Sequence, residues 1–184
     1  LFDQVFEKGT VKTEEEFRAK IAESLQPQLE ANSDYKFMID VRTYCEQKVG
    51  EITWPDALLK RIMLANNKDK GEDFVEKNYA ESIKQLEWHL IKEQLVKAND
   101  IKVEDADIKN AAKEMARMQF AQYGMSNVPE EYVDNYANEL LKKREAVDNF
   151  IERAIDVKLA AALKSTVSLN NKEVTLEEFN EMMK

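Results

Sequence analysis

The chain has 184 residues, and its 36 acidic and 27 basic side chains give it a formal net charge of −9. With only 4 glycines and 3 prolines, it lacks the turn residues that strand-rich sandwiches and barrels need roughly every ten residues. Charged residues make up 34% of the chain, interleaved with apolar ones, which is typical of long solvated helices. Composition therefore predicts an all-α protein.

The net charge and the cysteine content also limit which classes of partner and which cellular compartment are expected. A negative balance without a dense basic stripe repels polyanions, so we expect no direct nucleic-acid partner. No apolar run approaches the roughly 20 residues of a membrane span, so no membrane partner is expected. The single Cys45 excludes an intrachain disulfide and favours a reducing compartment. The chain opens on Leu1, which we interpret as the start of a fragment or processed product.

The first predicted helix is long and follows a short lead over residues 1–9. Thr13 and Glu16 have the spacing of a capping box, in which each side chain bonds a backbone N–H of the other residue. The apolar spacing then predicts a helix to about Val49, with a stripe that contains Phe17, Ile21, Leu25, Leu29, Met38, Val41, Cys45 and Val49. Pro27 interrupts this helix and predicts a kink or a break there, because proline removes one backbone donor.

Five further helices are predicted in chain order. Pro55 opens the second helix at the first helical position, and a polar stretch over 66–71 ends it. The remaining patterns predict helices over 72–98, 105–122 and 129–163, the last bent near 142–144, and a short capped helix from Thr175. The helix over 105–122 carries one apolar stripe of Ile108, Ala111, Met115 and Met118.

Residues 52–59 (ITWPDALL) resemble residues 101–108 (IKVEDADI) at a constant offset of 49 positions. Each copy follows a long helix and precedes another. The echo predicts two similar helical hairpins, arising near Ile52 and Ile101. Chance similarity between amphipathic helices is the alternative.

Residues that could carry catalysis or hold a cofactor are scarce. The chain has one histidine, His89, and one cysteine, Cys45, and both lie within helical patterns where a structural role is favoured. One of each cannot complete a zinc site, and four scattered glycines cannot form a phosphate-binding loop. We therefore predict no enzyme activity, no metal and no cofactor.

Apolar side chains, in contrast, exceed what one core-facing stripe can bury. The excess is densest at the end of the helix over 105–122 and in the loop after it, at Met115, Met118, Phe120, Tyr123 and Met125. Flexible thioethers beside aromatic rings suit surfaces that adapt to many partners. Together with Leu59 and Met63 beside the stripe of the second helix, these residues form the predicted polypeptide-binding set. The alternative is that they pack inside the protein, in which case replacing Met118, Phe120 and Met125 together by Ser would lower stability.

Several segments resemble the bacterial trigger factor family of ribosome-associated chaperones. Residues 95–103 (LVKANDIKV) are similar to the family's connection between a long helix and an arm. Residues 51–59 (EITWPDALL) match its pattern of a polar residue, Ile, any residue, an apolar residue, Pro, any residue, Ala, Leu and an apolar residue. Residues 174–183 (VTLEEFNEMM) resemble the family's terminal helix, and the lead with Phe2, Val5 and Phe6 precedes the first long helix in the same order. The resemblance covers essentially the whole chain as the C-terminal, substrate-holding part alone, and Pro27 departs from it.

The resemblance implies a cytoplasmic, elongated helical body with two protruding hairpin arms, formed by residues 1–184 as a single chaperone domain. In the family such a body holds nascent or unfolded chains without ATP and contains no catalytic residues. It also implies that a ribosome-docking domain and a prolyl isomerase domain lie upstream of this sequence, so ribosome contact would run through the former. A linker from the ribosome-docking domain packs on this body in the family, so surface normally covered would be exposed here. Homodimer formation stays open.

Three functions remain open on the sequence alone. The leading one is an ATP-independent module that holds unfolded polypeptides on dispersed apolar surface. The rival is a helical adaptor for one dedicated protein partner, whose apolar residues would be concentrated in a single groove. The third is part of an isomerase whose catalytic domain lies elsewhere. Suppression of aggregation by several unrelated clients separates the first from the second.

Overall fold

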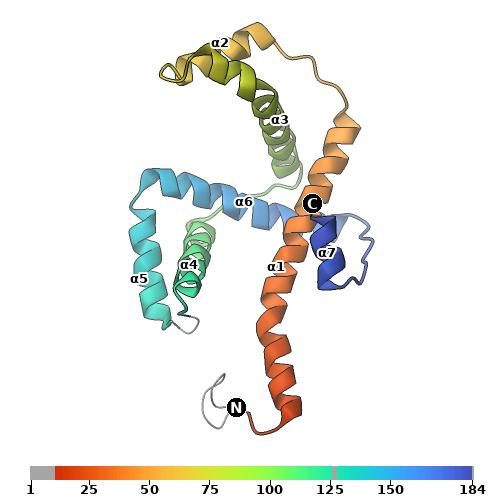
Figure 1. The fold of residues 1–184 in the computed structure, drawn as a ribbon, viewed down its shortest axis with the longest axis vertical. Coiled ribbons are helices and arrows are strands. Elements are labelled where there is room, and N and C mark those ends of the chain that lie inside the picture. The colour runs from red at the N-terminus through yellow and green to blue at the C-terminus, as the bar shows by residue number, and fades with distance from the viewer. Residues whose placement is uncertain (1–10, 126–127, 184) are drawn as a thin grey trace. The chain divides into compact units, whose positions relative to one another are not determined.

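The computed structural model describes residues 11–125 and 128–183 (Figure 1). The predicted lead with Phe2, Val5 and Phe6 lies outside these residues. Within the described part every regular element is a helix, which confirms the all-α prediction. In chain order the helices are α1 (Glu14–Val49), α2 (Asp56–Asn66), α3 (Gly71–Ala98), α4 (Asp105–Gln122), α5 (Glu130–Leu141), α6 (Arg144–Thr166) and α7 (Leu176–Met182).

The chain divides into two compact units. One comprises residues 1–48 with 173–184 and so contains most of α1 together with α7. The other comprises residues 49–172 and contains α2 to α6. Each unit is described by itself below.

In the first unit both helices begin with the capping boxes that the sequence predicts. The Glu16 N–H donates to Thr13 Oγ1 at 3.1 Å, and the Thr13 N–H donates back to a Glu16 carboxylate oxygen at 3.2 Å. At α7 the Glu178 N–H donates to Thr175 Oγ1 at 3.2 Å, and the Thr175 N–H donates to Glu178 at 2.8 Å. These reciprocal bonds satisfy amide donors that a helix start otherwise leaves without partners.

Helix α1 runs without interruption through Pro27, so the predicted alternative of a break there is wrong. Proline removes only one backbone donor, and the rest of the hydrogen-bond ladder continues on either side. Pro27 is also exposed, so water can solvate the carbonyl that loses its intrahelical partner. None of the residues of α1 is fully buried.

In the second unit, α2 runs back along the first part of α3. Lys60 on α2 pairs with Glu76 on α3, and Asp56, nearer the start of α2, contacts Tyr79, farther along α3. This order of contacts makes the two helices an antiparallel hairpin joined by the turn over residues 67–70. Helices α4, α5 and α6 pack on one another, and α6 also contacts α3.

Small side chains allow α4, α5 and α6 to approach closely. The buried cluster contains Ala111 and Ala112 of α4, Ala137 of α5 and Phe150 of α6. Ala112 and Ala137 have no solvent exposure at all, so a larger side chain at either position would have no room. This three-helix cluster is the main core of the described chain.

The two repeated segments occupy matching local positions. Ile52 and Ile101 both lie in short non-helical connections, each four residues before the next helix, which begins at Asp56 or Asp105. A residue with positive φ lies shortly before each of them, Gly50 (72°) two residues before Ile52 and Asp100 (48°) directly before Ile101. Such values favour glycine or a residue with a short polar side chain. The shared layout agrees with the echo in the sequence.

Most predicted helix boundaries lie within a few residues of those observed. Helix α4 covers 105–122 as expected, whereas the helix predicted over 129–163 is two helices. Lys143 adopts an extended conformation between them, at the place where the sequence predicts a bend. No helix among the described residues is long and apolar enough to cross a membrane.

Candidate polypeptide-binding surface

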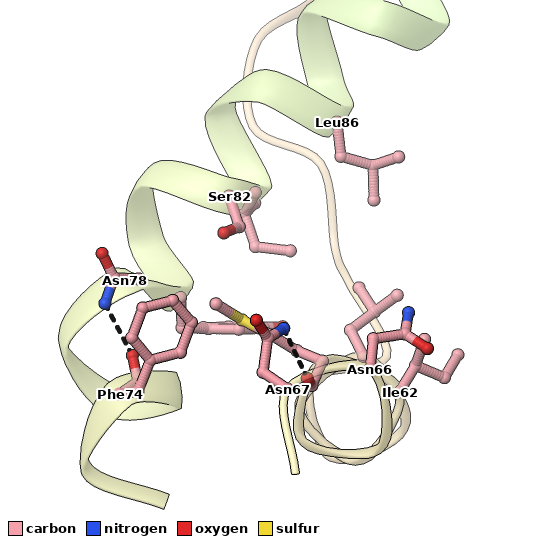
Figure 2. Close-up of a pocket in the computed structure, with 11 residues that line it drawn as sticks. Ile62, Asn66, Asn67, Phe74, Asn78, Ser82 and Leu86 are labelled. Atoms are coloured by element: carbon pink, nitrogen blue, oxygen red, sulfur yellow. Dashed lines mark hydrogen bonds between the residues drawn. The ribbon is translucent and has the colours of Figure 1, made fainter. Parts of the chain in front are cut away.

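A groove of about 430 Å³ lies between α2 and α3 (Figure 2). Leu59 and Met63, both in the predicted binding set, line it from α2. Most of the opposite side is apolar and comes from α3, with Phe74, Tyr79, Ile83 and Leu86. The polar lining residues are Asn66, Asn67, Asn78 and Ser82. An apolar groove with a few amides and hydroxyls can bury hydrocarbon side chains while it offers hydrogen bonds to a polypeptide backbone.

Polar contacts between α2 and α3 fix the position of the groove wall. The Tyr79 hydroxyl donates to Asp56 Oδ1 at 2.6 Å, and Lys60 Nζ lies 2.8 Å from Glu76 and 5.1 Å from the centroid of the Tyr79 ring. Desolvation and the hydrogen bond to Asp56 raise the pKa of Tyr79 to about 12, so this hydroxyl keeps its proton at neutral pH. The Tyr79 ring therefore forms a fixed side of the groove.

Two of the amides that line the groove are held by their own helices. Asn67 Nδ2 donates to the Met63 carbonyl at 3.0 Å, and Asn78 Nδ2 donates to the Phe74 carbonyl at 2.8 Å (Figure 2). The Asn67 bond closes the C-terminal end of α2, where carbonyls lack intrahelical partners. These contacts hold the amide groups beside the apolar lining.

Helix α2 is apolar on its outer side as well. Leu58 keeps 51% of its exposure and Ile62 keeps 47%. Ile62 lines both the groove and a second hollow of about 730 Å³, which Leu58, Arg61, Leu64, Ala65, Lys68, Gly71 and Glu72 also line. An apolar surface thus continues around α2. Leu58 and Ile62 are absent from the predicted binding set, although consecutive apolar residues at 58 and 59 indicate a helix with more than one apolar face.

The predicted residues of α4 and the following loop divide between the core and the surface. Met115 packs against the buried cluster of α4, α5 and α6. Phe120 is half-buried, with its ring 5.5 Å from that of Tyr136 on α5. Met118, Tyr123 and Met125 keep 46%, 77% and 49% of their exposure. The structure therefore exposes only part of this set, and Phe120 lies between the buried and the exposed members.

Helix α5 adds an aromatic surface that the sequence analysis does not include. Tyr132 is exposed and lines a hollow of about 580 Å³ with Phe120 and Tyr136. Tyr136 also donates a hydrogen bond to Gln119 on α4. The sequence shows that Tyr132 and Tyr136 lie in the helix that begins after Pro129. It does not show whether they are exposed, because that depends on how α5 packs against α4.

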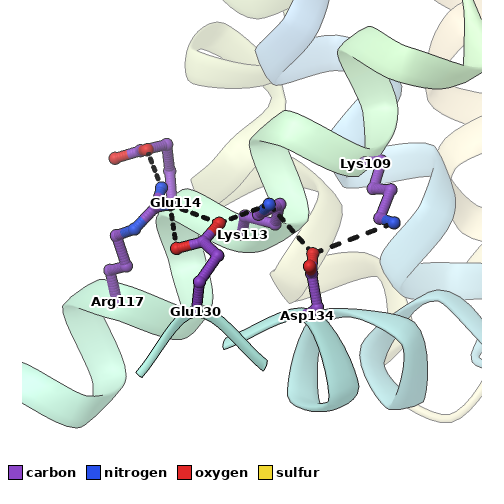
Figure 3. A network of polar contacts seen from close by, with 6 residues as sticks. All are labelled: Lys109, Lys113, Glu114, Arg117, Glu130 and Asp134. Atoms are coloured by element: carbon purple, nitrogen blue, oxygen red, sulfur yellow. Dashed lines mark hydrogen bonds and ion pairs between the residues drawn. The ribbon is translucent and has the colours of Figure 1, made fainter. Parts of the chain in front are cut away.

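A network of charged side chains joins α4 to α5 (Figure 3). Lys113 pairs with Glu130 and lies 2.9 Å from Asp134. Arg117 lies 2.9 Å from Glu130 on one side, and Lys109 lies 3.8 Å from Asp134 on the other. Cations along α4 thus alternate with carboxylates along α5, and the attraction complements the contact between small apolar residues beneath it.

The network shifts the acidity of its members. The hydrogen bond from Lys113 lowers the pKa of Asp134, and those from Lys113 and Arg117 lower the pKa of Glu130. The two carboxylates in turn raise the pKa of Lys113. Opposite charges favour each other's ionised forms, so Lys113, Glu130 and Asp134 are charged at neutral pH.

The two residues with the most reactive side chains occupy ordinary surroundings. Desolvation and the neighbouring Glu46 raise the pKa of Cys45, which disfavours the nucleophilic thiolate. His89 Nε2 lies 3.7 Å from Glu93, one turn along the exposed side of α3. Among the described residues, no three His, Cys, Asp or Glu side chains are grouped as a metal site would require.

Comparison with known proteins gives one result. The family model described as "Probable trigger factor, C-terminal domain" matches residues 33–183. No curated protein and no solved structure matches the chain. The matched range takes in residues 33–49 of α1 and all of α2 to α7, and it agrees with the resemblance of the connecting segments and the terminal helix. The chain therefore belongs to the family of trigger factor C-terminal domains, a family of chaperone modules distinct from the isomerase domain.

Proposed function

We propose that this chain holds nascent or unfolded polypeptides, without ATP, on apolar surface spread over its helical hairpins. The observation that carries the proposal is the distribution of that surface. It includes the groove between α2 and α3, the outer side of α2 with Leu58 and Ile62, and the end of α4 with Met118 and Met125. Several separate patches suit clients without a defined shape, whereas an adaptor for one partner would concentrate them.

Two helical arms, contact with the ribosome and a cytoplasmic location are what the family implies for this chain. The α2–α3 hairpin and the α4–α5 pair would be the two arms of an elongated cradle, arising near Ile52 and Ile101. Contact with the ribosome would run through the family's N-terminal domain, and the protein would act in the cytoplasm. The chain itself would turn over neither prolyl peptides nor ATP.

The size of the apolar contacts fits reversible holding. Moving one such side chain from water into a contact contributes roughly 1.5–3 kcal/mol at most. A few contacts, reduced by the entropy of association, give an affinity of roughly micromolar, or about −8 kcal/mol. A client bound this weakly dissociates on its own, so release needs no energy source.

The test is suppression of aggregation for several chemically unrelated unfolded proteins. We expect the chain to delay aggregation of most of them, and the Leu58→Ser/Ile62→Ser variant to delay it less. Both residues are half-exposed, so the variant should keep the contacts of Lys60 with Glu76 and of Tyr79 with Asp56 that join α2 to α3. Val157→Ser is the matched control, because Val157 is an exposed apolar residue of α6 outside these patches. Activity on a single client alone would support the adaptor instead.

The patch at the end of α4 has its own variant. The structure favours replacing Met118 and Met125 by Ser and leaving Phe120, whose ring packs near Tyr136. We expect weaker client holding at an unchanged melting temperature. Adding Phe120→Ser should lower the melting temperature as well, because it removes a half-buried aromatic ring. Unchanged holding by the double variant would remove this patch from the binding surface.

A further inference from the structure

One buried charge lies where α3 meets α6. Lys92 keeps only 9% of its exposure and is the one polar or charged residue that the described part of the chain buries. Its Nζ lies 2.6 Å from Glu152 and 3.1 Å from Asp156, two carboxylates one turn apart on α6. The buried residues of α3 are Val75 and Lys92 alone, and Val75 lies near the other end of the helix. Lys92 is thus the buried side chain that α3 contributes where it meets α6, and its partners there are two carboxylates.

The charge balance at this cluster keeps the lysine ionised. Burial acts to lower the pKa of Lys92, but the two carboxylates outweigh it and raise the pKa above its ordinary value. A buried ammonium needs such partners, because an unpaired charge in a covered site costs several kcal/mol. Both carboxylates are themselves half-exposed, so dissolved ions can reach them.

A second lysine ties the next turn of α6 to the connection between α3 and α4. Lys158 Nζ donates to the Lys102 carbonyl at 2.8 Å and lies 2.5 Å from Asp107. One short stretch of α6, from residue 152 to 158, therefore holds both the C-terminal half of α3 and the segment that leaves it. The α2–α3 hairpin meets the three-helix cluster at this stretch.

We propose that Lys92, Glu152 and Asp156 form a salt-sensitive latch that fixes the orientation of the α2–α3 hairpin relative to α4, α5 and α6. The attraction holds α3 on α6 at low ionic strength. Screening or neutralising the carboxylates frees the hairpin to swing about the connection that Lys158 retains. The apolar groove between α2 and α3 moves together with the hairpin. The latch therefore determines the orientation of that groove relative to the patch at the end of α4.

Distances between two spin labels in the full chain test the latch. The labels are attached at Lys68→Cys in the α2–α3 turn and Asp148→Cys on α6, both exposed, with Cys45→Ser in the background. In about 0.1 M salt, where charges act over about 10 Å, we expect one narrow distance distribution. In about 1 M salt, where that range falls to about 3 Å, the distribution should broaden and its mean should shift.

Charge-removing variants separate the latch from general effects of salt. Glu152→Gln/Asp156→Asn keeps the side-chain shapes, and we expect its distribution at low salt to be as broad as that of the wild type at high salt. Glu139→Gln on α5 is the control, since it breaks an exposed pair with Lys142, the residue that follows this helix, and its distribution should stay narrow. A narrow, salt-independent distribution in the folded double variant would overturn the proposal. Should that variant fail to fold, a wild-type distribution that does not change with salt overturns it equally.

Discussion

At the scale of single residues, a network of ion pairs adds to the apolar contact between α4 and α5. Lys113 keeps only 17% of its side-chain exposure and contacts two carboxylates of α5. The sequence shows the alternation of acids and bases but not which of them meet, because pairing across helices depends on the angle between the helices. Spacing along one helix predicts only pairs three or four residues apart.

The lowered pKa values of Glu130 and Asp134 predict acid sensitivity. A carboxylate whose pKa is lowered in the folded state stabilises that state above its unfolded pKa, and this contribution is lost as the pH falls through the folded value. The loss should begin below the ordinary values of 4.5 for Glu130 and 3.8 for Asp134. We therefore expect the unfolding free energy of the wild type to fall more steeply below about pH 4.5 than that of Glu130→Gln/Asp134→Asn.

Denaturant unfolding at a series of pH values measures this difference. Glu131→Gln, on the exposed side of α5, is the control and should behave as the wild type does. The size of the effect will be modest, because exposed ion pairs contribute little each. Equal pH profiles for the wild type and the double variant would show that the network does not stabilise the fold.

At the scale of helices, local signals predicted the elements well and their packing less well. The capping boxes at Thr13 and Thr175 depend on neighbouring residues alone, and the structure has both. The predicted apolar stripe of α4 matches the buried face only in part. Ala112 and Ala116 lie outside the stripe and are buried, whereas Met118 belongs to it and is exposed. A helix that packs on two others buries more than one face, and periodicity cannot show which faces are covered.

Pro27 provides a test of how far α1 depends on its own hydrogen bonds. Alanine there would restore a backbone donor and remove the clash of the proline ring with the preceding turn. In a helix interior this exchange is worth up to about 3 kcal/mol. We expect Pro27→Ala to raise the hydrogen-exchange protection of the α1 amides near residue 27. Protection that stays the same would mean that the surrounding turns already accommodate the proline without cost.

Close packing of small residues makes the three-helix cluster sensitive to added volume. Ala137 has no exposure and lies in the buried cluster with Ala112 and Phe150. We expect Ala137→Leu to lower the unfolding free energy by about 1–3 kcal/mol, as overpacking typically does. Thermal melting compares it with Ala161→Leu at an exposed position of α6, which should cost little. A melting temperature for Ala137→Leu equal to that of the control would show that α4 and α5 can separate freely.

At the scale of the whole chain, the order of the segments supports the family assignment. The proposed function depends instead on which apolar side chains are exposed. The repeated connections and the terminal helix could be read from sequence and agree with the family match over 33–183. The proposed binding surface could be predicted from the sequence only in part. Met115 was predicted to be accessible and packs on the core, whereas the exposed Leu58, Ile62 and Tyr132 were not singled out. Exposure is a property of the assembled helices, and one amphipathic pattern fits several assemblies.

The central claim is that dispersed, exposed apolar side chains hold unfolded polypeptide. Its most direct test is the affinity for one permanently unfolded, fluorescently labelled polypeptide, measured without nucleotide, for the wild type and a variant with Leu58, Ile62, Met118 and Met125 all changed to Ser. We predict roughly micromolar binding by the wild type, at least about tenfold weaker binding by the variant, equivalent to about 1.4 kcal/mol, and the same melting temperature for both. Equal affinity of the two proteins, with the variant folded, would contradict the account.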